Sequence, residues 1–372
     1  MIYLVLSWIA APWLYLRLLW PNRRGEPQQI LLIQTAKIGD FICTTPLFRE
    51  IKRRYPHSRL SVLLHPVNAP LAAYNPHIDL ILSYQAADYR GLPGKWRLLK
   101  LLRRHGFDTV IGISPNLTFI LAPLWAGVVR RLSILPNFGG RSYRLAAPFL
   151  TAGEPHVAGR LVLDTAFALL RRIDIQAASR DKEVYAHPAA EAKLEAWLAP
   201  PTRGRRLVGI GLSSGNKLKE LGTAKLAQLV RQFIAQSDDL VVLIGAAPDR
   251  AQGEEILRLL GASGRVVNSA GVFSLEELPA LISRLGLYVG VDSGITYMAD
   301  ALRIPLIDIM GPADADDQRP TGERAIVLRP PVSCAPCSHA FLAPYACANG
   351  TRSCIVSVSA NEICKHAANI LP

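Results

Sequence analysis

Residues 287–302, LYVGVDSGITYMADAL, decide the fold expected for this chain. An apolar run of strand length ends at Asp292, a Ser-Gly turn follows, and apolar residues then recur with helical spacing (Ile295, Met298, Ala299, Leu302). In an open α/β sheet this junction lies at the carboxyl end of a strand, where ligands bind. The new helix offers unpaired N–H groups and a positive dipole end to an anion such as a diphosphate. The alternative is an ordinary Asp-Ser-Gly turn.

The same alternation of apolar strands and helices runs through both halves of the chain. In the first half a strand at Ile30–Ile33 leads through a Gly-containing loop to a helix at Phe41–Tyr55. After a linker expected at Pro200–Gly204, the pattern restarts with a strand at Leu207–Leu212. Further strands are expected at Leu60–His65, Leu80–Ser83, Val110–Ile113, Leu240–Ile244 and Leu306–Ile309. This pattern predicts two α/β, Rossmann-like domains with parallel sheets, facing each other across a cleft.

The length and composition agree with a two-domain globular protein. The chain has 372 residues, half of them hydrophobic, with no low-complexity tract. No fixed-period repeat is present, which argues against solenoids and propellers. The first loop, residues 34–40, lacks the GxGxxG pattern of dinucleotide enzymes, so NAD binding is not indicated.

The positive charge is concentrated in the first half of the chain. Residues 1–200 contain 25 Lys and Arg against 13 Asp and Glu, whereas residues 201–372 contain 17 against 16. This asymmetry indicates that the first half faces nucleic acid, an acidic membrane surface or a phosphorylated glycolipid, unless the basic surface is idle. Because aromatic residues do not interleave with the basic clusters as in a nucleic-acid module, we expect a membrane and no nucleic acid.

The N-terminal segment, residues 1–27, is expected to associate with the membrane. Residues 1–20 carry no charge before Arg17, are interrupted by Pro12, and contain interfacial aromatics (Trp8, Trp13, Tyr15, Trp20). An interfacial anchor is favoured, and a spanning helix or a helix buried in protein remain alternatives. If the segment spans the membrane, the arginines on its carboxyl side would keep the following domain cytoplasmic. We therefore expect the protein at the cytoplasmic face of the inner membrane, peripheral or N-terminally anchored.

Three further loops at strand ends carry candidate site residues. Ser213, Ser214 and Lys219 lie in a loop whose small residues and lysines suit phosphate oxygens, or which is simply a solvated basic loop. Asp249 follows the next strand and could reach a ribose hydroxyl or cap a helix. Asp40 stands where the first loop becomes a helix, as a general base or as a helix cap.

Four segments together resemble the heptosyltransferase family, glycosyltransferase family nine, which builds lipopolysaccharide core. They are ILLIQTAKIGDFICTTPLFREIKRRYP at 30–56, VGIGLSSGNKLKELGTAKLAQLV at 208–230, VVLIGAAPDR at 241–250, and 267–320. The resemblance implies a GT-B fold, with an acceptor-binding domain at 28–200 and a nucleotide-sugar-binding domain at 201–372. The chain departs from the family's usual K-x-W-P at Lys219–Gly222, and has Tyr297 where histidine is common.

The resemblance also assigns roles to the candidate residues. Asp40 matches the family's catalytic base, and Lys219 matches the lysine near the donor diphosphate, with Ser213 and Ser214 nearby. Asp292, Ser293 and Gly294 match the element at the phosphates, and Asp249 lies near the nucleoside position.

The expected activity is inverting glycosyl transfer. Asp40 would deprotonate an acceptor hydroxyl, and the cationic site would stabilise the departing diphosphate, so catalysis needs no cofactor. The expected donor is ADP-heptose, and the expected acceptor is a lipopolysaccharide-type or other lipid-linked anionic glycan. Alternatives are a nucleotide-sugar epimerase or hydrolase of the same shape, and a non-catalytic, membrane-bound nucleotide-sugar-binding protein.

Five of the six cysteines fall in the last 39 residues. Cys334, Cys337, Cys347 and Cys354 could form a tetrahedral thiolate site for structural zinc or iron. Free or packed thiols and disulfides are the alternatives, the last disfavoured in a reducing cytosol. Cys364 lies in a helical stretch and is left out of the metal set.

Overall fold

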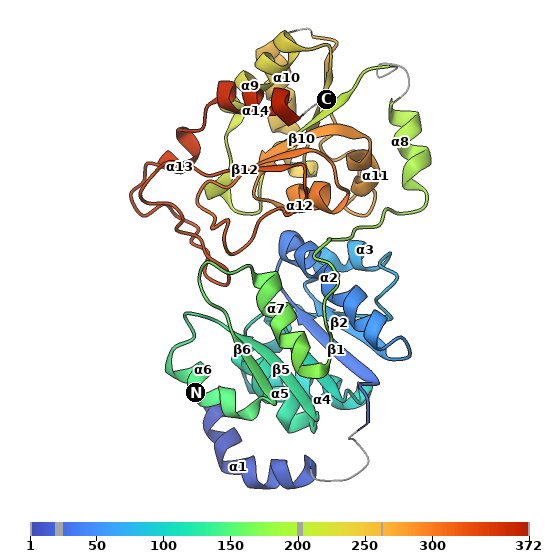
Figure 1. Ribbon diagram of the computed structural model, residues 1–372, viewed down its shortest axis with the longest axis vertical. Coiled ribbons are helices and arrows are strands. Elements are labelled where there is room, and N and C mark those ends of the chain that lie inside the picture. The colour runs from blue at the N-terminus through green and yellow to red at the C-terminus, as the bar shows by residue number, and fades with distance from the viewer. Residues whose placement is uncertain (1, 19–24, 199–203, 262, 371–372) are drawn as a thin grey trace. The chain divides into compact units, whose positions relative to one another are not determined.

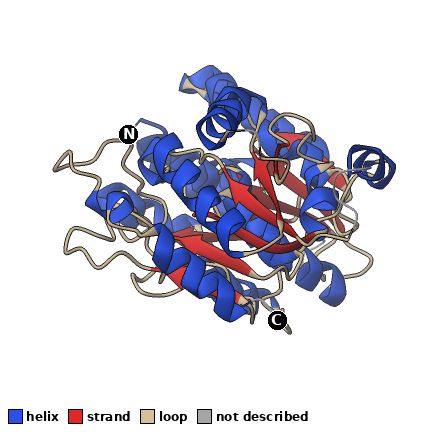
Figure 2. Cartoon of the chain, turned by 90° about the horizontal axis from the view of Figure 1, so that it is seen from above, coloured by secondary structure: helices blue, strands red, loops and turns tan. Residues whose placement is uncertain are grey.

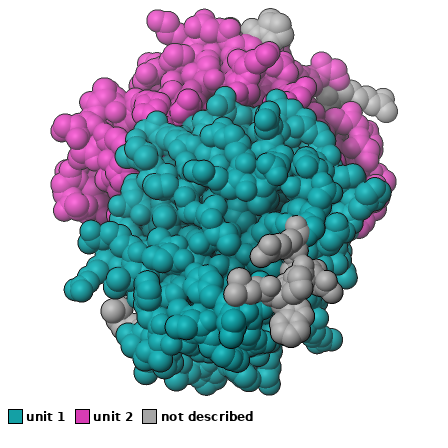
Figure 3. Space-filling view, turned by 60° about the horizontal axis from the view of Figure 1, so that its bottom comes forward, with its two compact units in different colours: residues 1–180 teal, residues 181–372 magenta. Residues whose placement is uncertain are grey.

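The computed structural model describes residues 2–18, 25–198, 204–261 and 263–370 (Figure 1). In each half of the chain, parallel strands are accompanied by helices (Figure 2). The chain divides into two compact units, which are unit 1, Met1–Arg180, and unit 2, Asp181–Pro372 (Figure 3).

Unit 1 contains a six-stranded sheet in the order β3-β2-β1-β4-β5-β6, with every strand parallel to its neighbours. Five consecutive residues of β1 are buried, which is typical of a parallel strand covered on both faces. The strands are β1 Gln29–Gln34, β2 Arg59–Leu64, β3 Leu80–Ser83, β4 Thr109–Gly112, β5 Arg130–Leu135 and β6 Ala152–Pro155.

The α-helices of unit 1 connect these strands and cover the sheet (Figure 1). They are α1 Ile2–Leu18, α2 Ile38–Arg54, α3 Ala69–Ala72, α4 Gly91–His105, α5 Leu117–Ala126, α6 Gly140–Ala146 and α7 Val162–Leu170. Short 3-10 turns lie at η2 Pro66–Asn68, η3 Ala86–Tyr89, η4 Ala147–Phe149 and η5 Arg171–Ile173. One core cluster joins Leu31 and Ile33 of β1 to Leu98 and Leu102 of α4 and to Phe119 of α5.

Unit 2 repeats this plan with the sheet order β12-β11-β10-β7-β8-β9, again all parallel. Every residue of β7 and of β8 is buried, as expected for central strands. The strands are β7 Leu207–Gly211, β8 Leu240–Ile244, β9 Val266–Asn268, β10 Leu285–Val291, β11 Leu306–Ile309 and β12 Ala325–Leu328.

The helices of unit 2 enclose its core. They are α8 Ala190–Leu198, α9 Thr223–Gln236, α10 Arg250–Leu260, α11 Leu278–Ser283, α12 Gly294–Ala301, α13 Ser353–Val356 and α14 Ala360–Ile370, with 3-10 turns η6 Lys217–Lys219 and η7 Ala247–Asp249. The predicted apolar face of α9 is confirmed at Leu226, Leu229, Val230 and Phe233, which are buried in the core.

Both sheets have the strand order of a Rossmann fold, and the predicted α/β, GT-B class is confirmed. In each sheet the order reverses between the first and fourth strands of the unit, β1 and β4 in unit 1 and β7 and β10 in unit 2. Loops that leave the carboxyl ends of these strands form the ligand crevice in such folds. Asp40 lies after β1, and the loops at 212–220 and 292–294 lie after β7 and β10.

The units divide 20 residues before the boundary predicted at 200/201. Residues 181–198 pack on unit 2 because Lys182 pairs with Asp300 at 2.6 Å and Trp197 meets Phe273 edge to face. The expected linker at 200–204 lies mostly outside the described residues, which omit 199–203.

Helix α1 belongs to unit 1 and packs on α5 and α6 through Leu4, Ser7 and Leu14. Of the expected N-terminal segment, residues 1 and 19–24 lie outside the described residues. Among the residues that are described, we find no helix whose length and apolar character together suffice to cross a bilayer.

Candidate active site

The predicted base, Asp40, lies in the first turn of α2, directly after the switch-point strand β1. Helix α2 begins at Ile38 with Lys37 as its N-cap, so Asp40 occupies the third helical position and is not the N-cap. The positive end of the helix dipole there favours an ionised carboxylate.

The backbone around Asp40 is fixed by a buried polar cluster. Thr44 Oγ1 donates to the carbonyl of Asp40 at 2.7 Å and accepts from Gln34 Nε2 at 2.7 Å. Ser114, which follows β4, donates to Gln34 Oε1 at 2.6 Å and accepts from the N–H of Thr35 at 2.9 Å. The loops after the two switch-point strands of unit 1 are therefore tied together beneath the Asp40 turn.

In unit 2 the structure brings Lys219 and Asp292 together, although 73 residues separate them in the sequence. The ammonium of Lys219 pairs with Asp292 Oδ2, and their side chains are 16% and 9% exposed. Tyr297 of α12 donates its hydroxyl to the other oxygen, Asp292 Oδ1, at 2.7 Å. Thus a nearly buried cation stands at the carboxyl end of β10, where α12 begins.

The serines predicted for this site lie in the same place. Ser214 Oγ donates to the carbonyl of Asp292 at 3.3 Å, which joins the loop after β7 to the loop after β10. Ser293 is the N-cap of α12, makes no side-chain capping bond, and its hydroxyl lies 3.2 Å from Thr296 Oγ1. Gly294 is the first residue of α12, so the phosphate element of the resemblance coincides with a helix N-terminus.

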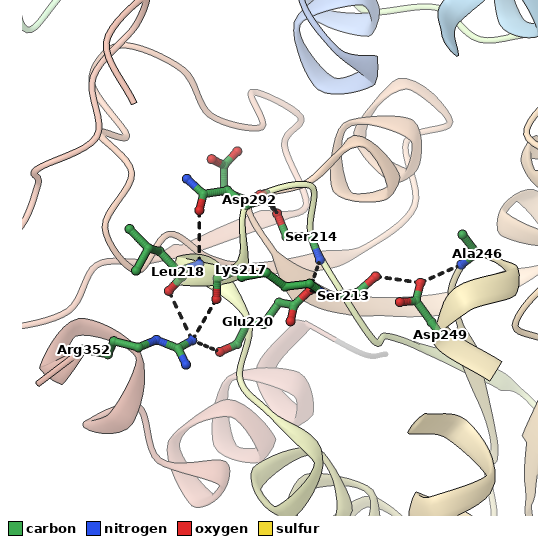
Figure 4. A network of polar contacts seen from close by, with 10 residues as sticks. Ser213, Ser214, Lys217, Leu218, Glu220, Ala246, Asp249, Asp292 and Arg352 are labelled. Carbon is green, nitrogen blue, oxygen red and sulfur yellow. Dashed lines mark hydrogen bonds and ion pairs between the residues drawn. The ribbon is translucent and has the colours of Figure 1, made fainter. Parts of the chain in front are cut away.

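Asp249 holds a turn beside this site and is itself nearly buried. Its Oδ2 accepts from Ser213 Oγ at 2.7 Å and from the N–H of Ala246 at 2.8 Å (Figure 4). Reaching back to a backbone N–H three residues earlier is half of a capping box. The structure therefore joins Ser213 and Asp249, as neighbours of the Lys219–Asp292 pair along the same sheet edge.

Sequence reasoning missed the residues that shape the 213–220 loop. Glu220 Oε1 accepts from the N–H of Ser214 at 3.1 Å and from Lys217 Nζ at 2.8 Å, which closes the loop on itself (Figure 4). Arg352 donates to the carbonyls of Lys217, Leu218 and Glu220 from the C-terminal tail. No local motif marks Arg352, because its partners lie more than 130 residues away.

A buried acid beneath the site was also missed. Asp308 of β11 lies opposite Gly290 of β10 and is 0% exposed. Among the described residues, neither its two carboxyl oxygens nor the hydroxyl of Tyr288 has a hydrogen-bond partner. Burial first, and then the charge of Asp292, raise the pKa of Asp308 well above its usual value. Burial likewise raises the pKa of Tyr288 to about 12.

The C-terminal tail, which contacts the 213–220 loop through Arg352, also carries the cysteines. Its five cysteines form no disulfides, and Cys334 and Cys337 are exposed whereas Cys354 is buried. Burial raises the pKa of Cys354, and the charges of Cys337, Cys334 and Cys347 raise it further. All four are described residues, and the structure does not bring their thiols together as a group of atoms close enough to share one metal ion. Cys364 lies in α14, in the helical stretch expected from the sequence, and packs in the core of unit 2.

In the part of the chain that the structure describes, a group without cysteines brings metal-ligand atoms close together. Carboxylate and imidazole atoms of Asp314, Asp317 and His339 lie within 4.8 Å of one another. His339 Nδ1 is 3.0 Å from Asp314 Oδ2, and Asp317 Oδ2 accepts from the N–H of Ala340 at 2.8 Å. These bonds attach the cysteine-bearing loop to the loop after β11.

Known proteins are similar to this chain in sequence and in fold. A lipopolysaccharide heptosyltransferase 3 of Escherichia coli is 23% identical over 77% of this chain and 85% of its own length. A lipooligosaccharide heptosyltransferase 2 of Haemophilus influenzae is 29% identical over 81% of this chain and 88% of its own. The solved structure of the E. coli ADP-heptose lipopolysaccharide heptosyltransferase II superimposes with a TM-score of 0.69 at 19% identity, covering 92% of this chain and 98% of that one.

The family model of glycosyltransferase family 9 (heptosyltransferase) matches residues 95–343, from α4 of unit 1 to the tail of unit 2. Three of the four sequence segments lie within this match, and the resemblance to the family is thereby confirmed. The chain belongs to glycosyltransferase family 9, and it is a glycosyltransferase.

Proposed function

We propose that the enzyme transfers heptose from ADP-heptose, with inversion, onto a lipopolysaccharide-type or other lipid-linked anionic glycan. The observation that carries this proposal is the Lys219–Asp292–Tyr297 cluster at the N-terminus of α12. A nearly buried ammonium beside a helix N-terminus suits a diphosphate. The phosphate oxygens would pair with the ammonium of Lys219, either in place of the carboxylate of Asp292 or together with it. The named activity of the E. coli relative supports ADP-heptose as the donor.

In this proposal each residue has one task. Asp40 removes the proton of the acceptor hydroxyl as it attacks the anomeric carbon. Lys219, Ser213, Ser214 and the N-terminus of α12 at Ser293 and Gly294 stabilise the diphosphate as it departs. Asp292 orients Lys219 before the donor binds, and Asp249 supports the nucleoside side of the site. The diphosphate is a good leaving group, so catalysis needs no metal or cofactor.

Calorimetric titration of the purified enzyme with ADP, GDP, UDP and NAD tests the donor assignment. We expect ADP to bind best, and Lys219→Ala to weaken ADP by about 10- to 100-fold, because a hydrogen bond to a charged group contributes about 1.5–3 kcal/mol. Lys365→Ala is the matched control, because Lys365 is an exposed lysine of α14 and lies outside the 213–220 loop. Preference for GDP or UDP would change the donor, and absence of nucleotide binding would contradict the assignment.

Incubation with the donor alone separates the alternatives. A transferase should leave ADP-heptose intact until an acceptor is added, whereas an epimerase or hydrolase should consume it alone. A non-catalytic binding protein should bind the donor without converting it in either case.

We also propose a structural zinc or iron at the four-cysteine cluster, separate from catalysis. Cys334, Cys337, Cys347 and Cys354 form no disulfides, and a Cys-x-x-Cys pair followed by two more cysteines is a pattern typical of a thiolate ligand set. Elemental analysis of protein purified without chelator should find about one metal per chain, and Cys337→Ser should lower that content while Cys364→Ser keeps it. Metal-free wild-type protein would contradict this proposal.

A further inference from the structure

Helix α1 has an apolar stripe that unit 1 leaves uncovered. Five side chains spaced three or four residues apart lie along it and are 51–72% exposed (Ile2, Val5, Ile9, Trp13, Leu16). We call these residues the α1 stripe. The helix carries no charged residue before Arg17. A contiguous apolar helix face of this kind marks an interaction surface, since single exposed apolar residues are ordinary but stripes are not.

The orientation of this stripe is fixed by the opposite side of the helix. Leu4 and Leu14 are 3% and 2% exposed and pack with Ile120, Leu124 and Phe149 of unit 1.

Polar atoms on α1 reinforce that attachment. Trp8 Nε1 donates to the carbonyl of Leu145 at 3.1 Å, and the hydroxyl of Tyr15 donates to the carbonyl of Pro148 at 3.0 Å. Trp125 Nε1 donates to Ser7 Oγ at 2.9 Å. The helix is therefore a built part of unit 1, and its stripe points away from that core.

Basic side chains surround the helix. Arg17 lies over the ring of Trp13 at 4.7 Å, and Lys95 of α4 lies 5.3 Å from the ring of Tyr3. Helix α6, which contacts α1, exposes Arg141 and Arg144.

The same sign of charge dominates the whole unit. Residues 1–180 contain 23 lysines and arginines against nine acidic residues. An apolar stripe with a basic surround complements a membrane that carries anionic lipid. Two copies joined by this stripe would bring like charges together, so self-association fits less well.

We propose that unit 1 docks on an anionic phospholipid membrane through the α1 stripe, with α1 lying in the interface and its surrounding cations on the lipid headgroups. Docking places the enzyme where a lipid-linked acceptor resides. It needs neither donor nor acceptor, so it stands or fails independently of the proposed function.

Co-sedimentation of the full-length protein with vesicles tests this docking. The probes are vesicles of phosphatidylethanolamine with phosphatidylglycerol, and vesicles of phosphatidylcholine alone. We expect the protein to bind the anionic vesicles at least tenfold more tightly than the zwitterionic ones. Binding to the anionic vesicles should also weaken at least tenfold when the salt concentration rises from about 0.1 M to about 1 M.

The test variant carries Ile9→Gln and Leu16→Gln, which replace two of the most exposed stripe residues. We expect at least tenfold weaker binding to anionic vesicles, because burying even one such side chain is worth about a factor of ten. The control carries Leu259→Gln and Val356→Gln, two exposed apolar residues of unit 2, 43% and 64% exposed, and should bind like wild type. Thermal melts of both variants establish that they fold.

Three results would overturn the proposal. The first is that the wild-type protein does not bind anionic vesicles. The second is that the stripe variant binds them as tightly as wild type does, and the third is that wild type binds both kinds of vesicle equally. A stripe variant that changes from dimer to monomer in sedimentation velocity, with vesicle binding unchanged, would instead assign the stripe to a second copy of the chain.

Discussion

Replacement of the buried acid, Asp308→Asn, should stabilise the enzyme, and the gain should grow with pH. Asp308 is fully buried and its two oxygens have no hydrogen-bond partner among the described residues. Burial and the charge of Asp292 raise its pKa well above the usual value, with Asp300 adding to the rise and Lys219 opposing it. The folded protein thus keeps a proton that the unfolded chain releases.

The sign and size follow from proton linkage. Because the native state binds more protons than the unfolded state, stability falls as pH rises from the unfolded pKa toward the folded one. Each pH unit in that window removes up to about 1.4 kcal/mol. Asparagine does not titrate, so the free energy of unfolding of Asp308→Asn should not fall with pH in this way. For a domain of the size of unit 2 the gain corresponds to about 3–6 °C in Tm per pH unit.

Differential scanning calorimetry of wild type and Asp308→Asn between pH 5 and pH 8 provides the measurement. Asp316→Asn is a control of opposite sign, because the Arg329 hydrogen bond lowers the pKa of Asp316. That variant should lose stability, by no more than about 1 kcal/mol since the pair is half-exposed. A Tm difference for Asp308→Asn that is constant with pH, or that turns more negative as pH rises, would refute the reasoning.

Two further substitutions probe the same unit. Tyr297→Phe removes the 2.7 Å hydrogen bond to Asp292 and should weaken ADP by about 3- to 10-fold in calorimetry with little change in Tm; an unchanged Kd would show that Tyr297 does not orient Asp292. Lys182→Met leaves Asp300 buried without its ion-pair partner, both side chains being 3% exposed, and should cost about 3–5 kcal/mol in urea denaturation. A loss below about 1 kcal/mol would contradict this estimate, and would show that the backbone N–H groups of Thr321 and Gly322, which also donate to Asp300, suffice for its carboxylate.

The strand–turn–helix signature at 285–302 was predictable because its signals are local. The apolar run, the Ser-Gly turn and the helical spacing all lie within one stretch, and β10 and α12 follow it. The strands β5, β6, β9 and β12 were not predicted. Strand β9 has three residues, β6 and β12 are only partly buried, and β5 begins with two arginines and contains Ser133, so it has no long apolar run. Short or half-buried strands carry little periodicity.

The partners within the site could not be read from sequence. Lys219 and Asp292 were each singled out, but their pairing depends on β7 and β10 being neighbours in the sheet. Glu220 occupies the variable position of K-x-W-P, so its role in closing the 213–220 loop required the coordinates. Asp308 sits in the apolar run LIDI, which predicts a strand and says nothing of the unpartnered acid. The unit boundary was misplaced because residues 181–198 join unit 2 by tertiary contacts alone.

The measurement that tests the central claim most directly is transfer of heptose by Asp40→Asn, assayed with ADP-heptose and a lipid-linked heptose acceptor. A general base contributes about 10²- to 10⁴-fold, so kcat should fall by that factor while the Kd for ADP stays at its wild-type value. Asp88→Asn, an exposed acid of unit 1, is the control and should turn over like wild type. Wild-type kcat in Asp40→Asn, at unchanged ADP affinity, would contradict the assignment of Asp40 as the base of this glycosyltransferase.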